Sequence, residues 1–462
     1  MRKVKAGLLP LYIKLYDDTV PQLRPRLERF YDKLVTLLEK EGLEIIRTPF
    51  CRVASEFKDA VKMYESEKAD CIITINMAYS PSLESAEALT KTELPIVVMD
   101  TTETYGFGPD QSPAEIDYNH GIHGVMDLCN ILKRAGKMYA IAAGHYSRSD
   151  VVKQTARYAK AAYAARSVSG SKVGSIGGAF EGMGDFQVTA KELKERFGVE
   201  LSSALPDELR AIAATITDEE IEAEIKADKK RFKYPKKIDK EIYKVNVRAC
   251  LTVRKWIEAR GLDAFSVNFF KACPAYGLDT MPFAEACKAM ERGIGYAGEG
   301  DVLDAVFAAV LIRAFEAVSF VEIFCPDWQD DRLFLSHMGE MNYKIAADVP
   351  EMQMRTVNYA DSVMPMAAYA CYKEGDAVYA NIYRDEEGYC LLATPVKMLR
   401  VENDSNFKGS VRGWMKPAMP VADFLRKLSE HGATHHSILV YDVQPEELMF
   451  FGKLLNMKVY KI

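Results

Sequence analysis

The stretch that decides the fold is residues 4–48, which contains the runs VKAGLLPLY (4–12), QLRPRLERFYDKLVTLLEKE (22–41) and LEIIRT (43–48). The two outer runs are short and apolar, so they predict β-strands. In the middle run, apolar residues recur every three or four positions and fall on one stripe of a helix. They are Leu23, Leu27, Phe30, Tyr31, Leu34 and Leu38. A strand, a helix and a second strand in succession predict two parallel strands joined by a helix that covers them.

The same alternation of strands and helices continues through the first two-thirds of the chain. Further predicted strands are Asp70–Ile75, Pro95–Asp100, Met138–Ala142 and Lys172–Ile176.

After about residue 317 the strand-like runs follow one another with less helix between them. They are Val318–Phe324, Arg332–Leu335, Ala377–Tyr383, Gly388–Ala393 and Ser437–Tyr441, and Asp385–Gly388 between two of them predicts a hairpin loop.

We therefore predict an α/β protein with two doubly wound parallel-sheet domains and a β-rich, barrel-like C-terminal domain. The predicted domains are residues 1–171, 172–316 and 317–462.

Composition excludes several classes of protein. The net charge of −6 over 462 residues is small and argues against a nucleic-acid-binding protein. No apolar run approaches the length of a membrane span, and the N-terminus lacks the apolar core of a signal peptide, so we expect a cytoplasmic protein. The nine cysteines are scattered without a Cys-x-x-Cys pair, which predicts reduced core thiols.

A glycine-rich run, Gly293-Ile294-Gly295-Tyr296-Ala297-Gly298, matches the Gly-x-Gly-x-x-Gly pattern of dinucleotide-binding proteins. In those proteins the loop follows a strand, whereas here the run follows a helix-like stretch, Phe283–Arg292, which Gly293 is suited to end. We favour a tight turn that places Glu299 at a loop tip before a helix starting at Asp301. The alternative is that Glu299 and Asp301 only cap this helix.

Three further features could carry chemistry. Glu322 lies inside the apolar run 318–325, where a carboxylate is costly unless it is paired, coordinated or exposed on one side of the sheet. His337 ends another apolar run, and a lone histidine there is more often a hydrogen-bonded core residue. The pair His435-His436 precedes a strand-like run, and neighbours on a strand face opposite ways, so we expect only one of them to enter a given site.

Together, Glu299, Glu322, His337 and His436 offer a mixed oxygen and nitrogen donor set. Such a set suits Mn²⁺, Co²⁺ or a similar divalent cation, and coordination positions would stay open for the oxygens of a substrate.

These motifs resemble the metal-site segments of L-arabinose isomerases, in the same order along the chain. They are Gly298-Glu299-Gly300-Asp301, Ser319-Phe320-Val321-Glu322, Ser336-His337-Met338-Gly339-Glu340 and Ala433-Thr434-His435-His436. Weaker similarities in residues 117–124, 188–198 and 414–417 extend the resemblance over most of the chain.

The resemblance implies a metal-dependent aldose–ketose isomerase with two α/β domains and a β-barrel, in the superfamily of L-fucose and L-arabinose isomerases. It implies that Glu299, Glu322, His337 and His436 bind the metal, most simply Mn²⁺, with Co²⁺ or Mg²⁺ as alternatives, and that the two glutamates are the acid/base pair. It implies substrate contacts by His123, Met183, Phe269 and His435. It also implies a homo-oligomer, a trimer or hexamer, in which His123 reaches a neighbouring subunit's site.

The N-terminal region departs from the family. Leu9-Pro10-Leu11-Tyr12 lacks the family's glutamine that helps to hold the sugar, and residues 101–116 also differ. L-Fucose or another 6-deoxy or 6-substituted hexose therefore stays an alternative substrate. Against L-fucose, the resemblance implies an aspartate in fucose isomerases at the position of Glu322, so the glutamate favours the arabinose-type metal set. A non-catalytic sugar-binding protein and a nucleotide-dependent oxidoreductase are the alternatives from other classes.

Overall fold

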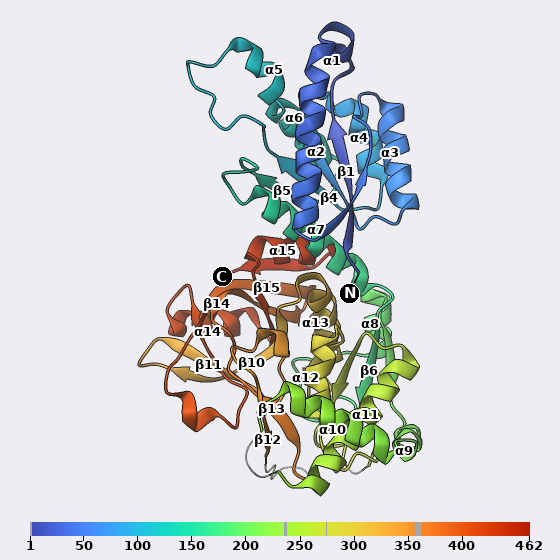
Figure 1. Ribbon diagram of the computed structural model, residues 1–462, viewed down its shortest axis with the longest axis vertical. Helices are drawn as coiled ribbons and strands as arrows, with labels where there is room; N and C mark the ends of the chain where they lie inside the picture. Colours follow the sequence, from blue (N-terminus) through green and yellow to red (C-terminus); the bar gives the residue numbers. More distant parts are fainter. Residues whose placement is uncertain (1, 235–237, 274, 356–361) are drawn as a thin grey trace. The chain divides into compact units, whose positions relative to one another are not determined.

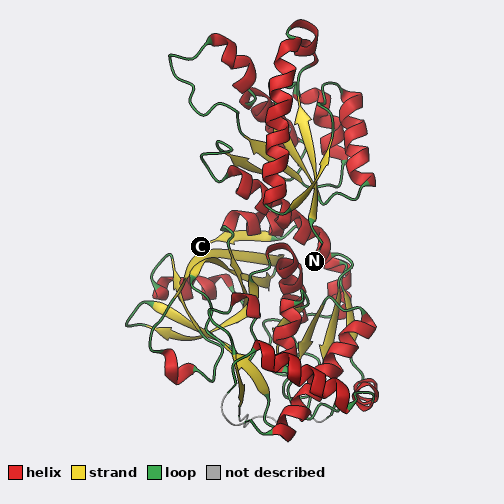
Figure 2. Cartoon of the chain, in the orientation of Figure 1, coloured by secondary structure: helices red, strands yellow, loops and turns green. Residues whose placement is uncertain are grey.

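In the computed structural model, which describes residues 2–234, 238–273, 275–355 and 362–462, the chain divides into two units, Met1–Arg166 and Ser167–Ile462. Helices and strands alternate along the first unit and the first half of the second (Figure 2). The second half of the second unit is mainly β-structure. The predicted domain boundaries after residues 171 and 316 stay a proposal. Among the described residues, no helix combines the length and apolar character that crossing a bilayer requires.

The first unit is built on a five-stranded parallel sheet with the strand order β2-β1-β3-β4-β5. Figure 1 labels β1, β4 and β5 of this sheet. Its strands are β1 (Val4–Leu11), β2 (Leu43–Arg47), β3 (Cys71–Asn76), β4 (Ile96–Asp100) and β5 (Tyr139–Ala143). Its helices are α1 (Lys14–Thr19), α2 (Arg24–Lys40), α3 (Ala54–Ser66), α4 (Ser82–Lys91), α5 (Ile116–Asn119) and α6 (Ile122–Arg134), and α7 (Val151–Val168) follows. Every residue of the central strand β3 is buried, which explains its continuous apolar run.

Helix α2 confirms the helical stripe predicted between residues 22 and 41. Its buried face consists of Leu27, Phe30, Tyr31, Leu34, Val35 and Leu38, and the helix begins with a proline in its first turn. Strands β1 and β2 pair in parallel on either side of this connection, as the sequence predicts.

The second unit begins with a four-stranded parallel sheet of order β7-β6-β8-β9. Its strands are β6 (Lys172–Ile176), β7 (Glu200–Ser203), β8 (Ala264–Val267) and β9 (Gly295–Gly298). Its helices are α8 (Ala190–Phe197), α9 (Pro206–Ala214), α10 (Asp218–Arg231), α11 (Lys240–Arg260), α12 (Phe283–Glu291) and α13 (Val302–Phe315). Strand β9 was not predicted, because two of its four residues are glycines, which have a low propensity for strands.

The remainder of the second unit is a closed six-stranded barrel of order β14-β17-β10-β11-β16-β15, closed by pairing of β15 with β14. Its strands are β10 (Val318–Asp327), β11 (Arg332–Ser336), β14 (Gly375–Asp385), β15 (Gly388–Leu399), β16 (Gly413–Pro417) and β17 (His436–Tyr441). The other elements are β12 (Glu351–Met354), β13 (Met366–Tyr369), α14 (Val421–His431), α15 (Pro445–Leu454) and β18 (Lys458–Lys461). The barrel-like C-terminal domain and the hairpin loop at Asp385–Gly388 are thereby confirmed.

All nine cysteines are free thiols, and most are buried, as predicted. The exceptions are Cys129, which is partly buried, and Cys325, which lies on the exposed outer end of β10.

Candidate metal centre

Glu299 occupies the sharp turn between β9 and α13. Its φ of 63° lies in the left-handed region, which a residue other than glycine enters at a cost of roughly 1–2 kcal/mol. The carbonyl oxygen of Glu299 accepts a hydrogen bond from the Phe180 amide at 2.8 Å, and its side chain is only 9% exposed. The next residue but one, Asp301, caps α13 by accepting the Asp304 amide at 2.9 Å. The turn therefore holds the Glu299 carboxylate in one place.

Three strands of the barrel supply the other predicted ligands. Glu322 on the middle strand, β10, lies opposite His436 on β17 and opposite Ser336 on β11, and His337 directly follows Ser336. Residues directly opposite each other on neighbouring strands project from the same face of a sheet with their Cβ atoms about 5 Å apart. The ladder thus brings Glu322 beside His436, although the two are distant in sequence. His337 lies just beyond the end of β11, with its Nε2 atom 3.6 Å from Glu322 Oε2.

Each histidine of the site is oriented by a carboxylate. His337 Nδ1 lies 2.7 Å from Glu340 Oε2, and His436 Nδ1 lies 2.9 Å from Asp301 Oδ2. His435 Nδ1 lies 2.7 Å from Asp185 Oδ2, which also accepts the backbone amide of His435 at 3.0 Å. A carboxylate at Nδ1 fixes the ring and leaves Nε2 free to act as a ligand, which is the usual arrangement around metal-binding histidines.

The Nε2 atoms face the two glutamates. Glu299 Oε2 lies 3.4 Å from the Nε2 atoms of both His435 and His436, and Glu322 Oε2 lies 3.6 Å from His337 Nε2. The donors form two groups whose atoms lie within 4.8 Å of one another, namely Glu299, His435 and His436, and Glu322, His337 and His436. His436 belongs to both groups.

Both adjacent histidines therefore approach Glu299, and the expectation that only one of them could enter the site is wrong. Strand β17 begins at His436, so His435 belongs to the preceding loop and does not follow the alternation of strand side chains. Their ring centroids lie 4.2 Å apart.

The electrostatic surroundings of the two glutamates differ. Burial raises the pKa of Glu299, but the imidazoles of His435 and His436 outweigh it and lower that pKa to about 2. Burial also raises the pKa of Glu322, and there the neighbouring histidines offset it only in part, so the net shift is upward. Two carboxylates with different proton affinities therefore face the same space.

Aromatic rings enclose the imidazoles. Phe186 stacks on His436 with centroids 4.9 Å apart, and Phe320 lies edge-on to both His337 and His436, also at 4.9 Å. These contacts keep water from the rear of the rings and strengthen electrostatic interactions at the site.

The residues expected to contact substrate lie in different places. Phe269 stacks on Phe180, with centroids 5.2 Å apart, next to the backbone of Glu299. Met183 lies in the loop that also carries Phe180, Asp185 and Phe186, and its amide donates to the Phe180 carbonyl at 3.4 Å. His123 belongs to the other unit, where it is exposed in the first turn of α6 and packs against His120.

Asp185, Asp301 and Glu340 were not predicted as partners of the histidines. Glu340 follows His337 by three residues, so the His-x-x-Glu spacing was a usable signal. Asp301 was interpreted only as a helix cap, and Asp185 is too distant in sequence from His435 to have been noticed.

The glycine-rich run serves packing. A Cβ atom on Gly295 would lie 2.0 Å from the Ala305 carbonyl oxygen of α13, and one on Gly298 would lie 2.6 Å from Cε1 of His337. These glycines let strand, helix and imidazole approach closely, which argues against a phosphate-binding loop.

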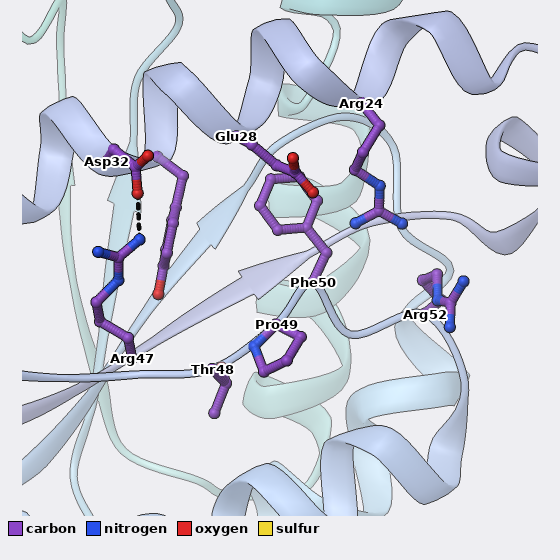
Figure 3. A pocket seen from close by; sticks show the side chains of 9 residues that line it. Arg24, Glu28, Asp32, Arg47, Thr48, Pro49, Phe50 and Arg52 are labelled. Carbon is purple, nitrogen blue, oxygen red and sulfur yellow. Dashed lines mark hydrogen bonds and ion pairs between the residues drawn. The ribbon is translucent and has the colours of Figure 1, made fainter.

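A groove of about 600 Å³ lies in the first unit between α2 and the segment that follows β2 (Figure 3). Each arginine in its wall already pairs with a carboxylate: Arg47 with Asp32, Arg24 with Asp17, and Arg52 with Glu56. The groove is lined by Arg24, Glu28, Tyr31, Asp32, Arg47, Thr48, Pro49, Phe50 and Arg52. None of the candidate metal donors described above lines this groove.

The donor set fits a divalent cation. His436 is completely buried, and its Nε2 has no hydrogen-bond partner although Glu299 lies within ion-pair distance. An unpaired polar atom of this kind is costly unless a ligand occupies the space in front of it. Carboxylate oxygens and imidazole nitrogens together suit Mn²⁺, Co²⁺ and related ions.

Comparison with known proteins gives consistent similarities. The profile of the L-arabinose isomerase central domain matches residues 182–318, and that of the L-arabinose isomerase C-terminal domain matches residues 317–458. The L-arabinose isomerase of Halalkalibacterium halodurans is 22% identical over 476 residues, which cover 96% of this chain and 90% of that protein. The L-arabinose isomerase of Shouchella clausii is 22% identical over 98% of this chain and 92% of its own length. L-arabinose isomerase 2 of Bacillus licheniformis is 22% identical over 74% of each chain.

Proposed function

We propose, from the premise that this chain belongs to the L-arabinose isomerase family, that it is an aldose–ketose sugar isomerase with its active site at the metal centre described above. The observation that carries the proposal is the convergence of two glutamates and three carboxylate-oriented histidines in the second unit.

We propose Glu299, Glu322, His337 and His436 as the metal ligands, with Mn²⁺ as the simplest ion. A bound cation would polarise the C1 and C2 oxygens of an open-chain sugar and stabilise negative charge on them. The unpartnered Nε2 of His436 and the two groups of donor atoms that share this histidine support the assignment.

Conversion of an aldose to a ketose removes a proton from C2 and adds one to C1, while a hydroxyl proton moves from O2 to O1. Two carboxylates beside the C1–C2 bond can take and return these protons, and we assign these roles to Glu299 and Glu322. Phe269, stacked on Phe180, would line the pocket together with Met183 and exclude water, and His435 would contact a hydroxyl group of the sugar. A hydride shift between C1 and C2 is the alternative route.

We propose a homo-oligomer, a trimer or hexamer, in which His123 of one subunit completes the site of a neighbour. His123 is exposed and stands between Ile122, 40% exposed, and Met126, 66% exposed, on the surface of α6. Large apolar side chains around an exposed histidine suit a contact between subunits. Light scattering of the purified protein tests the oligomer, and His123→Asn should then lower the rate without changing the size of the assembly.

The substrate is proposed as a pentose or hexose of the L-arabinose type, acted on in the cytoplasm. An L-fucose-like or other 6-deoxy or 6-substituted hexose is the alternative, because Leu9-Pro10-Leu11-Tyr12 in the first unit departs from the family. A sugar-binding protein without catalysis would have no need of the paired glutamates and the metal-type donors.

The decisive experiment incubates the Mn²⁺-loaded protein with a panel of aldoses and ketoses and measures interconversion. Glu299→Gln and Glu322→Gln should each reduce turnover by about 10²–10⁴-fold, the usual contribution of an acid or base, with the fold retained. Near-normal rates in either variant would refute the role of that glutamate. Binding of a sugar without turnover in the wild type would favour the binding-protein alternative.

A further inference from the structure

His435 is oriented in the same way as the two histidines assigned to the metal. All three imidazoles present Nδ1 to a carboxylate, at 2.7 Å for His337, 2.9 Å for His436 and 2.7 Å for His435. A residue that only touches a sugar hydroxyl does not need its free nitrogen directed at a second carboxylate. The Nε2 atom of His435 is directed at Glu299 Oε2, which is also within reach of His436.

Two of the three separations within this trio match those of ligands around one ion, and the third, between the two imidazole nitrogens, is within 4.8 Å. Carboxylate oxygens and imidazole nitrogens bind such cations at about 2.0–2.2 Å, so neighbouring donor atoms around the ion lie roughly 3.0–3.5 Å apart. Glu299 Oε2 lies 3.4 Å from each of the two Nε2 atoms. A charge-assisted hydrogen bond between these groups would be shorter, at about 2.7–2.9 Å. The spacing is therefore that of a site with room for an ion between its donors.

We propose that the protein has a second position for its divalent cation, held by Glu299, His435 and His436, in which His435 is a metal ligand. The first position, proposed above for Glu299, Glu322, His337 and His436, shares Glu299 and His436 with it. His436 has one free nitrogen, so one ion occupies one position at a time. Two imidazoles and one carboxylate suit Mn²⁺, Fe²⁺ and Co²⁺ and leave coordination positions for substrate oxygens.

The two positions differ in their access to solvent. The His337 side chain is 2% exposed, whereas those of His435 and Asp185 are 34% and 36% exposed. Glu322 is 20% exposed and Glu299 9%, so the difference in access lies with the histidines. We call the position at His435 the outer one and that at Glu322 and His337 the inner one. The inference rests on the proposed function for the choice of metal.

Mn²⁺ binding to the full-length protein, followed by electron paramagnetic resonance of the free ion, tests the proposal. The double variant Glu322→Gln/His337→Asn removes two donors of the inner position and should still bind one Mn²⁺ per chain, about 10–100-fold more weakly than the wild type. Adding His435→Asn should then abolish binding at millimolar Mn²⁺. His431→Asn, four residues before His435 and outside both donor groups, is the matched control and should leave the affinity unchanged.

Loss of all binding in the double variant would overturn the proposal, and so would equal affinity of the double and triple variants. If the double variant does not fold, Glu322→Gln alone with Co²⁺ keeps the test open. Its visible absorption spectrum should change when His435→Asn is added, and an unchanged spectrum would overturn the second position. If the wild type binds Mn²⁺ and isomerises sugar but the double variant binds no Mn²⁺, only the second metal position is refuted. A wild type with neither property would refute the proposed function.

Discussion

Replacing Glu340 with alanine removes the carboxylate that orients His337. Oε2 of Glu340 lies 2.7 Å from His337 Nδ1 and accepts the Gly339 amide at 2.8 Å, while Oε1 accepts the Tyr296 hydroxyl at 2.8 Å. All of these side-chain groups are buried, so alanine leaves three donors without an acceptor.

Two losses should follow. Removing the outer partner of a metal-binding histidine typically weakens metal binding by about 10–100-fold, which corresponds to roughly 1.4–2.7 kcal/mol. Each buried donor left without an acceptor costs about 1–3 kcal/mol of stability. Mn²⁺ titration by calorimetry measures the first loss, and urea unfolding of the metal-free protein measures the second.

Glu340→Gln is the matched control. Its amide oxygen can still accept from His337 and Gly339, and its NH₂ group can donate to the Tyr296 oxygen, so most of the affinity and stability should remain. We expect the order wild type, glutamine, alanine in both measurements. An alanine variant that binds Mn²⁺ within threefold of the wild type would refute the assigned role of Glu340.

Three further predictions concern other parts of the second unit. Gly298→Ala would place a Cβ atom 2.6 Å from Cε1 of His337, so Mn²⁺ affinity should fall at least about tenfold while the circular dichroism spectrum stays the same; unchanged affinity would contradict this packing. Asn381 is buried and donates to the carbonyl oxygens of Thr434 at 2.8 Å and His436 at 2.7 Å, so Asn381→Leu should lower the free energy of unfolding by about 2–4 kcal/mol in urea, and a loss below about 0.5 kcal/mol would count against it. Burial raises the pKa of Glu224, but Arg254 and Lys288 outweigh it and lower the pKa to about 2. Because the pKa is lowered, the stability that Glu224 contributes is complete above its unfolded value of about 4.3 and is lost as the pH falls toward 2. Glu224→Gln should therefore be less stable than the wild type at pH 7, and the difference should shrink in chemical unfolding at pH 3; a difference independent of pH would refute it.

The buried parallel strands could be predicted from the sequence because burial on both faces demands continuous apolar runs. Lys172–Ile176 was predicted with its observed bounds, and Cys71–Asn76 is shifted by one residue from the prediction. Strand β9 could not be predicted in this way. Its glycines have low strand propensity, and they are present because α13 and His337 leave no room for a side chain.

Candidate site residues could be recognised in the sequence where a polar group interrupts an apolar run, as at Glu322, or where histidines cluster, as at His435 and His436. Their orienting carboxylates could not, because Asp185 and Asp301 reach the histidines only through the tertiary fold. The near-equal approach of His435 and His436 to Glu299 also depends on where β17 begins, and strand ends are the least certain part of a sequence-based prediction.

The donor atoms come from both sides of a join, with Glu299 and Asp301 at the end of the parallel sheet and Glu322, His337 and His436 on the barrel. In a hybrid protein that carries the barrel of one relative, the barrel would supply three of these side chains. The host protein would supply the two at the end of the parallel sheet. The affinity of such hybrids for the ion would therefore be more sensitive than the melting temperature to small errors in the packing of the barrel against the parallel sheet. The proposed metal site therefore requires the parallel sheet and the barrel together.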